Sequence, residues 1–255
     1  MSKAIITPYN DSLYLRLKNG ELSLMSVCAS TEIICVGTEL LIGKTLNTNA
    51  QWLAKRIATL GLNVRRITVT ADDIDEISDT MQEALKRKPC FIITTGGLGP
   101  TFDDKTLEGI AKGLRRKVKV NDEALKMIEK TYRKYVEEGL IDKIELTPPR
   151  VKMAKLPEGA TPLPNPIGTA PAVLIEHEGT IVFALPGVPS EMEAIFEESV
   201  ARILKKAAGN ATFFETSISV LGIMESDIAP LIDQVMRNNP YVYIKSHPGR
   251  EGEKK

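Results

Sequence analysis

The sequence predicts an α/β protein whose mostly parallel sheet carries helices on both faces. Short apolar runs rich in β-branched residues alternate with helical patterns from residue 31 onward, and this order is typical of parallel sheets. Two of the apolar runs end directly in glycine-containing loops, at Gly37 and at Gly96. Because ligands of such sheets bind beyond the carboxyl ends of the strands, we expect the functional site at these loops.

The first half of the chain contains three strand–helix pairs. The expected strands cover 33–36, 64–70 and 90–94; the first and third are short, mostly apolar runs, and the second is rich in β-branched residues. Each expected helix shows apolar residues at helical spacing, over 47–60, 73–86 and 107–114. The helix over 47–60 is expected to end at Gly61, because glycine readily takes the left-handed conformation that follows many helices.

The second half continues with a charged helix over 121–138. Residues 146–171 hold seven prolines, and we expect an ordered loop there that wraps the site, because structureless linkers of this length are uncommon in compact domains. Residues 173–176 and 181–185 are expected to pair around a turn at Glu178-Gly179. A long helix is then expected over 190–207, where Ser190 and Glu193 have the spacing of a capping box.

Both ends of the chain depart from the strand–helix alternation. Residues 13–18 and 21–24 alternate around Asn19-Gly20, which predicts a β-hairpin. That segment is either an extension over a sheet edge or an overcalled start before Met25. A strand over 212–220, a helix over 225–237 and a strand over 241–245 predict a small α+β unit, whose thin core needs another segment, another subunit or further residues. The expected domains are 1–29, 30–208 and 209–255, the last of them truncated.

The overall composition excludes several classes of function. Lysine plus arginine and aspartate plus glutamate both number 33, so no global positive field favours nucleic acid. No apolar stretch approaches the roughly 20 residues that span a membrane, and no signal pattern opens the chain. The three cysteines lack a CxxC spacing; we expect Cys35 and Cys90 to be reduced core residues of a cytoplasmic protein. The two histidines are far from any nucleophile motif, so a serine or cysteine hydrolase and a zinc site are not expected.

The most informative motif is the glycine-rich loop over residues 94–106, Thr-Thr-Gly-Gly-Leu-Gly-Pro-Thr-Phe-Asp-Asp-Lys-Thr. Its glycines let backbone N–H groups approach a ligand, and the following helix N-terminus favours negative charge, so the loop suits a phosphate. Asp103 and Asp104 would repel that phosphate unless a divalent cation lay between them, which favours a metal such as Mg²⁺. For the Asp pair taken alone, helix capping and a first-turn charge are the alternative.

Three further segments can meet this loop in one cleft. The first holds Gly37, Thr38 and Glu39, followed by Asn47 and Asn49. Glu39 can hold a metal or orient water, or it can be a solvated loop residue, and Asn47 can line a site or cap the helix. The other two segments are 165–171 and 186–190. A further acidic pair, Asp72 and Asp73, follows the second strand and can either join the site or cap the next helix, and capping is the favoured role.

Taken together, these segments resemble the amino-terminal domain of the CinA family, within the wider molybdopterin-binding superfamily of MoaB, Mog and MoeA proteins. The resemblance runs from Thr31 to about His247. It rests on five ordered motifs: Gly-Thr-Glu-Leu-Leu-Ile-Gly, Asn-Thr-Asn-Ala, Gly-Gly-Leu-Gly-Pro-Thr-Phe-Asp-Asp, Asn-Pro-Ile-Gly-Thr-Ala-Pro and Leu-Pro-Gly-Val-Pro-Ser-Glu-Met. It implies a three-layer α/β/α fold, in a stand-alone form without the family's nicotinamide mononucleotide deamidase domain.

The resemblance implies a function but leaves alternatives open. One is a metal-dependent pyrophosphohydrolase of ADP-ribose-like dinucleotides. Another is a molybdopterin-binding, adenylyltransferase-like protein of molybdenum cofactor biosynthesis, and a third is a non-enzymatic nucleotide-binding module. The implied cofactor is Mg²⁺, alternatively Co²⁺ or Ni²⁺, with molybdopterin as an alternative ligand. The implied partners are a small nucleotide or pterin and further copies of the chain, in a dimer or trimer.

The resemblance also assigns roles to individual residues. Glu39, Asp103 and Asp104 would be catalytic and would hold the metal. Fifteen residues would bind the substrate: Gly37, Thr38, Asn47, Asn49, Thr95, Gly96, Gly97, Gly99, Pro100, Thr101, Gly168, Thr169, Gly187, Pro189 and Ser190. Within this set the three glycines at 96, 97 and 99 and the threonine at 101 would cradle the phosphate.

Overall fold

A computed structural model describes residues 2–6, 13–18, 21–26, 30–209, 214–240 and 242–247 of the chain. Its centre is a six-stranded sheet with the strand order β5-β4-β6-β11-β10-β9. The strands are β4 (Ser30–Val36), β5 (Asn63–Thr70), β6 (Phe91–Thr95), β9 (Thr161–Leu163), β10 (Ala172–His177) and β11 (Thr180–Leu185). Neighbours among β5, β4, β6 and β11 run parallel, whereas β10 is antiparallel to both β11 and β9.

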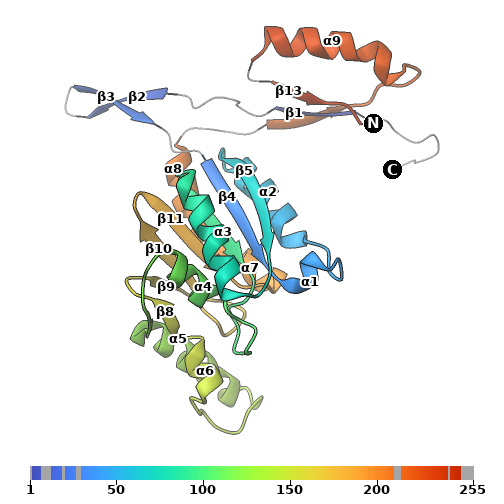
Figure 1. Cartoon of the computed structure of the whole chain (residues 1–255). Helices are drawn as coiled ribbons and strands as arrows, with labels where there is room; N and C mark the ends of the chain where they lie inside the picture. The colour runs from blue at the N-terminus through green and yellow to red at the C-terminus, as the bar shows by residue number, and fades with distance from the viewer. Residues whose placement is uncertain are drawn as a thin grey trace.

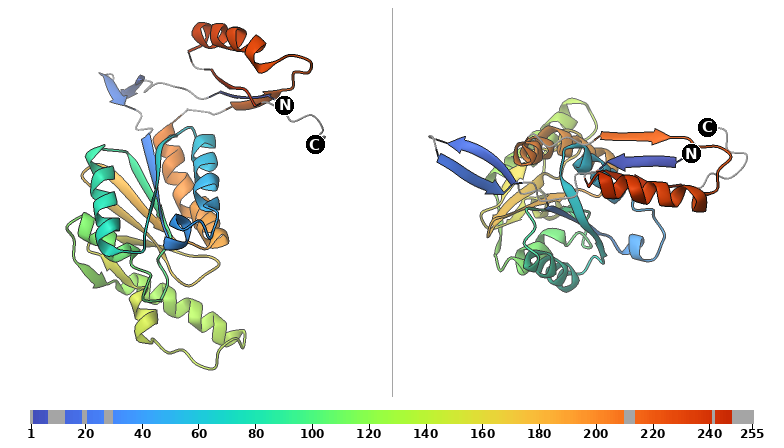
Figure 2. Two further views of the ribbon diagram at one scale, coloured as in Figure 1. Left: turned by 45° about the vertical axis from the view of Figure 1, so that its right-hand side comes forward. Right: turned by 90° about the horizontal axis from the view of Figure 1, so that it is seen from above.

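Helices cover both faces of this sheet, which confirms the expected three-layer α/β class (Figures 1 and 2). One face packs against α3 (Ile74–Lys86) and α4 (Thr106–Gly113). The other packs against α2 (Thr48–Thr59), α7 (Pro189–Ile195), a π-helical turn (Phe196–Val200) and α8 (Ala201–Ala208).

Alternation along the strands explains why both faces need cover. In β4, Ile34 belongs to the cluster under α3 and α4, whereas Ile33 and Cys35 belong to the cluster under α2 and α7. Successive side chains of a strand point to opposite faces, so a strand apolar at every position can be satisfied only between two helix layers. The continuous apolar runs of the sequence follow from this arrangement.

The helix starts are only partly as expected. Asn47 caps α2 by accepting a hydrogen bond from the Ala50 N–H at 3.1 Å. The expected capping box at Ser190 is wrong, because α7 has Val188 at its N-cap position without a side-chain bond and Pro189 in its first turn. Proline presets the helical φ and has no N–H to satisfy, so the helix begins one residue earlier and needs no hydroxyl cap.

The proline-rich segment contains more regular secondary structure than expected. It contains α6 (Pro148–Lys152), β8 (Lys155–Pro157) and β9, and β8 pairs with β7 (Val118–Val120). α5 (Asp122–Glu137) and α6 form the lobe at the bottom of Figure 1. The guanidinium of Arg150 lies 3.7 Å from the ring centre of Tyr132 and thereby fastens α6 to α5.

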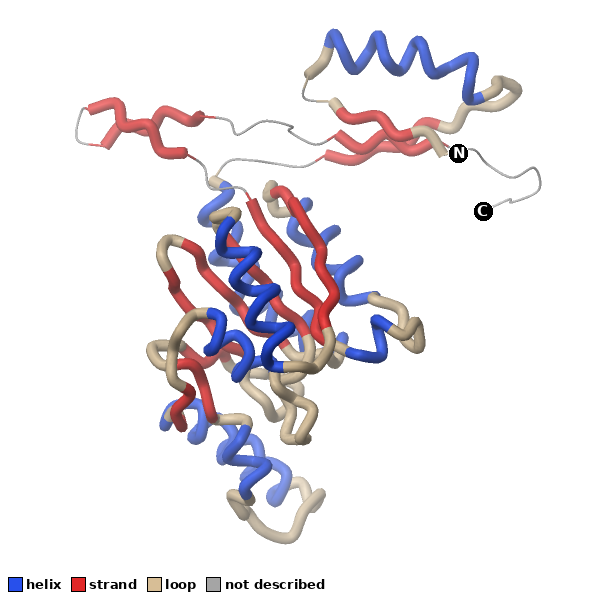
Figure 3. Tube along the Cα trace, in the orientation of Figure 1, coloured by secondary structure: helices blue, strands red, loops and turns tan. Residues whose placement is uncertain are grey.

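A small unit lies at the opposite end of the sheet (Figures 1 and 3). It contains β12 (Phe214–Ile218), α9 (Glu225–Asn238) and β13 (Tyr243–Lys245), and β1 (Ser2–Ile6) lies between the two strands, antiparallel to both. The partner segment expected for this unit is therefore the amino-terminal strand. The expected hairpin strands pair as β2 (Leu13–Lys18) and β3 (Glu21–Ser26), and the turn at 19–20 lies outside the described residues.

The two described cysteines differ in state. Cys35 is a free thiol buried under α2, and burial raises the pKa of this thiol, partly opposed by a hydrogen bond with Asn47. Cys90 is disulfide-bonded, so the expectation of a reduced thiol is wrong there. Within the described residues, no helix combines the length and the apolar character that crossing a membrane requires.

Candidate ligand-binding site

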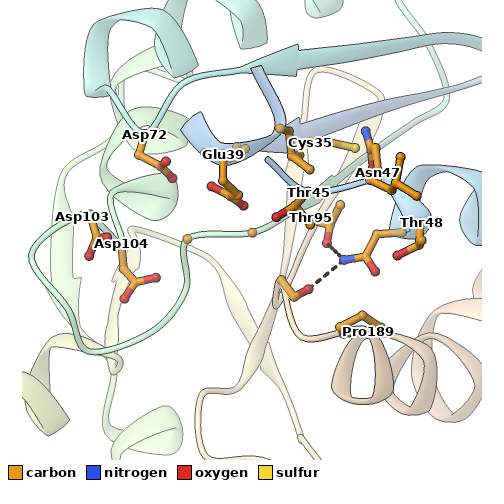
Figure 4. A pocket seen from close by; sticks show the side chains of 17 residues that line it. Cys35, Glu39, Thr45, Asn47, Thr48, Asp72, Thr95, Asp103, Asp104 and Pro189 are labelled. Atoms are coloured by element: carbon orange, nitrogen blue, oxygen red, sulfur yellow. Dashed lines mark hydrogen bonds between the residues drawn. The ribbon is translucent and has the colours of Figure 1, made fainter. Parts of the chain in front are cut away.

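A cavity of about 310 Å³ opens over the carboxyl ends of β4, β5 and β6. Four segments far apart in sequence line it: residues 35–49, Asp72, the glycine loop and the start of α7. Figure 4 shows Glu39, Asp72, Asp103 and Asp104 on one side, and Asn47, Thr48 and Pro189 on the other. The cavity therefore has an acidic half and an uncharged polar half.

The glycine loop can take its path only with glycines. Gly96 has a φ of +109°, and a Cβ there would lie 2.1 Å from the carbonyl oxygen of Val36. Gly97 has a φ of +63°, and a Cβ there would lie 2.3 Å from the hydroxyl of Thr106. The loop thus passes directly over the end of β4 and the start of α4, and a side chain at either position would displace it.

Asn49 joins the walls of the cavity. Its amide nitrogen donates to the hydroxyl oxygen of Thr95 at 3.0 Å and to the carbonyl oxygen of Gly187 at 2.9 Å. The Thr95 hydroxyl in turn donates to the carbonyl oxygen of Pro186 at 2.9 Å. The amide oxygen of Asn49 is buried without a partner. Asn49 therefore uses its donors to hold the walls together and keeps its acceptor free beside the cavity.

Asp103 and Asp104 precede α4 and do not cap it, because α4 has Lys105 at its N-cap position. Asp104 accepts a hydrogen bond from the backbone N–H of Thr101 at 2.8 Å and another from the Thr101 hydroxyl. That hydroxyl also contributes most to holding the pKa of Asp103 below its usual value, and the charges of Lys152 and Lys105 lower it further. Asp103 is therefore ionised at neutral pH.

The second acidic pair divides between two roles. Asp73 caps α3, accepting hydrogen bonds from the N–H groups of Asp75 at 2.9 Å and Glu76 at 3.2 Å, as expected. Asp72 instead lines the cavity, and its carboxylate accepts from the N–H of Thr38 at 2.7 Å. The sequence favoured helix capping for both residues, and this is correct for Asp73 but not for Asp72.

The carboxylates share a cavity without forming a ready-made metal centre. Among the residues that the structure describes, no three histidine, cysteine, aspartate or glutamate side chains come together to hold a metal ion. Glu39, Asp103 and Asp104 are hard oxygen donors of the kind that Mg²⁺ accepts. Mg²⁺ is commonly held by one or two carboxylates together with substrate phosphates and water. The donor set therefore fits a cation that arrives with a phosphate ligand.

The predicted binding residues fall into two groups. Ten predicted residues, including the three acids, line the cavity: Glu39, Asn47, Asn49, Thr95, Gly96, Gly97, Asp103, Asp104, Gly187 and Pro189. Eight others are not among its lining residues: Gly37, Thr38, Gly99, Pro100, Thr101, Gly168, Thr169 and Ser190. Several of them support the walls instead. Thr38 bonds to Asp72, Thr101 bonds to Asp104, and Gly168 lies against the carboxylate of Glu191.

Six further lining residues were not assigned to the site from the sequence, and one of them, Cys35, was expected only in the core: Cys35, Val36, Leu40, Thr45, Leu46 and Thr48. Most of them are apolar or carry a hydroxyl group. They form no recognisable catalytic or metal-binding pattern, so only their position next to the motifs could have indicated them.

The mostly parallel sheet between helix layers, with a polar cavity over its strand ends, defines an α/β/α ligand-binding protein. The sequence pattern of a family described as a probable molybdopterin binding domain matches residues 32–206. The chain belongs to this family.

Similar proteins are found among archaea. A protein of Pyrobaculum calidifontis is 51% identical over 216 residues, which cover 85% of this chain and 79% of that protein. A protein of Aeropyrum pernix is 48% identical over 216 residues, covering 85% and 78% of the two chains. The crystal structure of the CinA protein of Thermoplasma acidophilum, described as of unknown function, matches with a TM-score of 0.63 and 40% identity, over 70% of this chain and 99% of that one. The expected CinA-like domain is thereby confirmed.

Proposed function

We propose that the cavity binds the diphosphate of an ADP-ribose-like dinucleotide and hydrolyses it with the help of a divalent cation. The observation that carries this proposal is the acidic half of the cavity beside the glycine loop. Asp103 and Asp104 lie next to backbone that can approach a phosphate closely, and Glu39 and Asp72 line the same cavity. Without a cation, these four carboxylates would repel a diphosphate. The arrangement therefore favours a cation that lies between the carboxylates and the diphosphate.

The reaction is a substitution at phosphorus. The oxygen of a water molecule forms a bond to one phosphorus, and the bond from that phosphorus to the bridging oxygen breaks, which yields AMP and ribose 5-phosphate. A cation held between one or two of the carboxylates of Asp103, Asp104 and Glu39 and the diphosphate itself would lower the pKa of water and neutralise the diphosphate. Backbone N–H groups of residues 97–99 would stabilise the charge that develops on the phosphoryl oxygens. The N–H groups of Gly96 and Thr101 already donate to the carbonyl oxygen of Leu185 and to the carboxylate of Asp104. Asn47 and Asn49, in the uncharged half, would face the remainder of the nucleotide.

The test is the release of AMP from ADP-ribose, followed by chromatography with and without Mg²⁺, Co²⁺ or Ni²⁺. We expect AMP only with metal and not from Asp103→Asn, because this change removes a charge while keeping the shape. Asp142→Asn is the matched control, since Asp142 is exposed and lies outside the cavity. Metal-independent AMP, or full activity of Asp103→Asn, would exclude the metal assignment.

Molybdopterin binding is the second candidate, and the family description favours it. The same glycine loop would then hold the pterin phosphate. Tight binding of the pterin without AMP release under any metal would support this candidate. Retention of a nucleotide in a fixed ratio without turnover would instead support a non-enzymatic binding module.

We also propose that the chain forms a dimer or trimer. In the small unit, Phe214 and Leu221 are 70% and 91% exposed, and the described residues of α9 include none that is buried. Such a unit gains little stability from its own core. Light scattering coupled to size-exclusion chromatography is expected to give two or three times the mass of the chain, and a monomeric mass would exclude the proposal.

A further inference from the structure

The turn that carries Asp103 and Asp104 is held from outside by a lysine of the proline-rich segment. The ammonium group of Lys152 donates a hydrogen bond to the carbonyl oxygen of Thr101, 51 residues earlier. Thr101 is the residue whose N–H and hydroxyl both bond to Asp104. A chain of contacts therefore runs from Lys152 through Thr101 to a carboxylate of the cavity.

Lys152 stands on a rigid base. It is the last residue of α6, and Arg150 in the same helix stacks on Tyr132 and donates to the carbonyl oxygen of Glu145 at 2.7 Å. The next two residues, Met153 and Ala154, are buried in the core. The ammonium group thus reaches Thr101 from a fixed backbone position, so the bond can restrain the turn.

The glycine loop needs such a restraint. Gly96 and Gly97 have positive φ values, and glycine loses more conformational freedom on folding than any other residue. The start of α4, which follows this turn, has Lys105 at its N-cap position and receives no side-chain capping bond. A charged hydrogen bond to the turn is therefore well placed to keep the carboxylates facing the cavity.

Lys155 provides a natural comparison. Lys152 and Lys155 both line a recess of about 20 Å³ on the glycine loop, together with Gly97, Gly99 and Asp104. Lys155 is exposed, and no hydrogen bond or ion pair of its side chain is seen among the described residues. The two lysines therefore bring similar charge to the loop, but Lys152 alone of the pair is bonded to it.

We propose that Lys152 is a positioning residue, which holds the Thr101–Asp104 turn so that its carboxylates present the cation to the diphosphate. The effect of Lys152 on catalysis rests on the proposed hydrolysis. Its effect on the conformation of the turn does not. Removing the bond should loosen the turn whether or not the protein turns over ADP-ribose.

The first measurement is amide hydrogen exchange over residues 98–106 in three full-length variants. Lys152→Met keeps the apolar stem and removes the donor, and we expect exchange in this segment to rise about tenfold, while exchange in α2 stays unchanged. Lys152→Arg retains a cationic donor and is expected to restore most of the protection. Lys155→Met is expected to match the wild type. Unchanged exchange in Lys152→Met would overturn the proposal.

The second measurement is kinetic. For a positioning role, kcat of AMP release is expected to fall about tenfold or more in Lys152→Met, with KM for ADP-ribose changed less than threefold and with recovery in Lys152→Arg. A rise in KM with unchanged kcat and unchanged loop exchange would make Lys152 a direct phosphate contact and overturn the proposal. If the wild type releases no AMP, the hydrolase proposal fails, and the exchange experiment still decides the role of Lys152.

Discussion

The side-chain amide of Asn49 donates a hydrogen bond to the hydroxyl oxygen of Thr95 at 3.0 Å, and so joins the start of α2 to the end of β6. The second N–H of the same amide reaches the carbonyl oxygen of Gly187 at 2.9 Å. Three walls of the cavity therefore depend on one side chain. A residue that we expected to bind the ligand therefore also joins segments of the site.

Asn49→Asp is expected to destabilise the protein and to weaken ligand binding together. The carboxylate has the size of the amide but cannot donate a hydrogen bond, so it places an oxygen against the carbonyl oxygen of Gly187 with no proton between them. We expect a loss of about 1–3 kcal/mol in the free energy of unfolding, measured by urea denaturation. Gln51→Glu is the control, because Gln51 lies on the same helix with an exposed side chain. Equal stability of the two variants would contradict the role of Asn49.

Gly96→Ala is expected to cost far more stability than Gly43→Ala. Both glycines have positive φ values, +109° and +70°, but a Cβ at Gly96 would strike the carbonyl oxygen of Val36, whereas Gly43 has no atom within 4 Å of the added Cβ. We expect about 1 kcal/mol of backbone strain at Gly43, and a loss above about 3 kcal/mol at Gly96, where the loop must also move. Thermal unfolding of both variants measures the difference, and similar melting temperatures would show that the loop yields without cost.

Arg87→Met is expected to destabilise the fold by about 3 kcal/mol, because it leaves the carboxylate of Glu32 buried without a partner. Arg87 donates two hydrogen bonds of 2.7 Å to Glu32, whose side chain is only 4% exposed. Lys134→Met is the matched control, since it breaks a surface pair with Glu138 and should cost about 0.5 kcal/mol or less. Urea denaturation at neutral pH compares the two, and a loss at Arg87 as small as at Lys134 would show that Glu32 finds another partner.

The cap of α3 predicts a loss of stability in acid. The N–H groups of Glu76 and Asp75 hold the pKa of Asp73 below its ordinary value of 3.8. A carboxyl group with a lowered pKa contributes stability above its unfolded pKa and loses it as the pH falls through the folded pKa. The stability difference between wild type and Asp73→Asn, which keeps an acceptor but does not titrate, should therefore be constant above about pH 5 and shrink below pH 3.8. A difference that grows on acidification would contradict this account.

Several parts of the fold follow from local pattern. The apolar runs that became β4, β6 and β11 and the helices around Leu53 and Ile77 were predictable, because burial on one or two faces imposes a periodicity that a short window of sequence contains. The need for glycine at positions 96 and 97 of the glycine loop was equally predictable, since only glycine adopts positive φ values without strain. The start of α7 was misjudged because Pro189 outweighed the hydroxyl of Ser190.

What the sequence determined by itself is therefore the succession of most strands and helices, the family, and the glycine-containing loops at the strand ends. Only the tertiary structure decided that β1 completes the small unit, that Asp72 lines the cavity while Asp73 caps a helix, and that Lys152 donates a hydrogen bond to Thr101. The physical reason is distance along the chain. The periodicity of a strand or helix can be recognised within about a dozen residues. The hydrogen bonds of Lys152 and Asn49 instead join residues 51 and 138 positions apart, and they form only when the layers pack together.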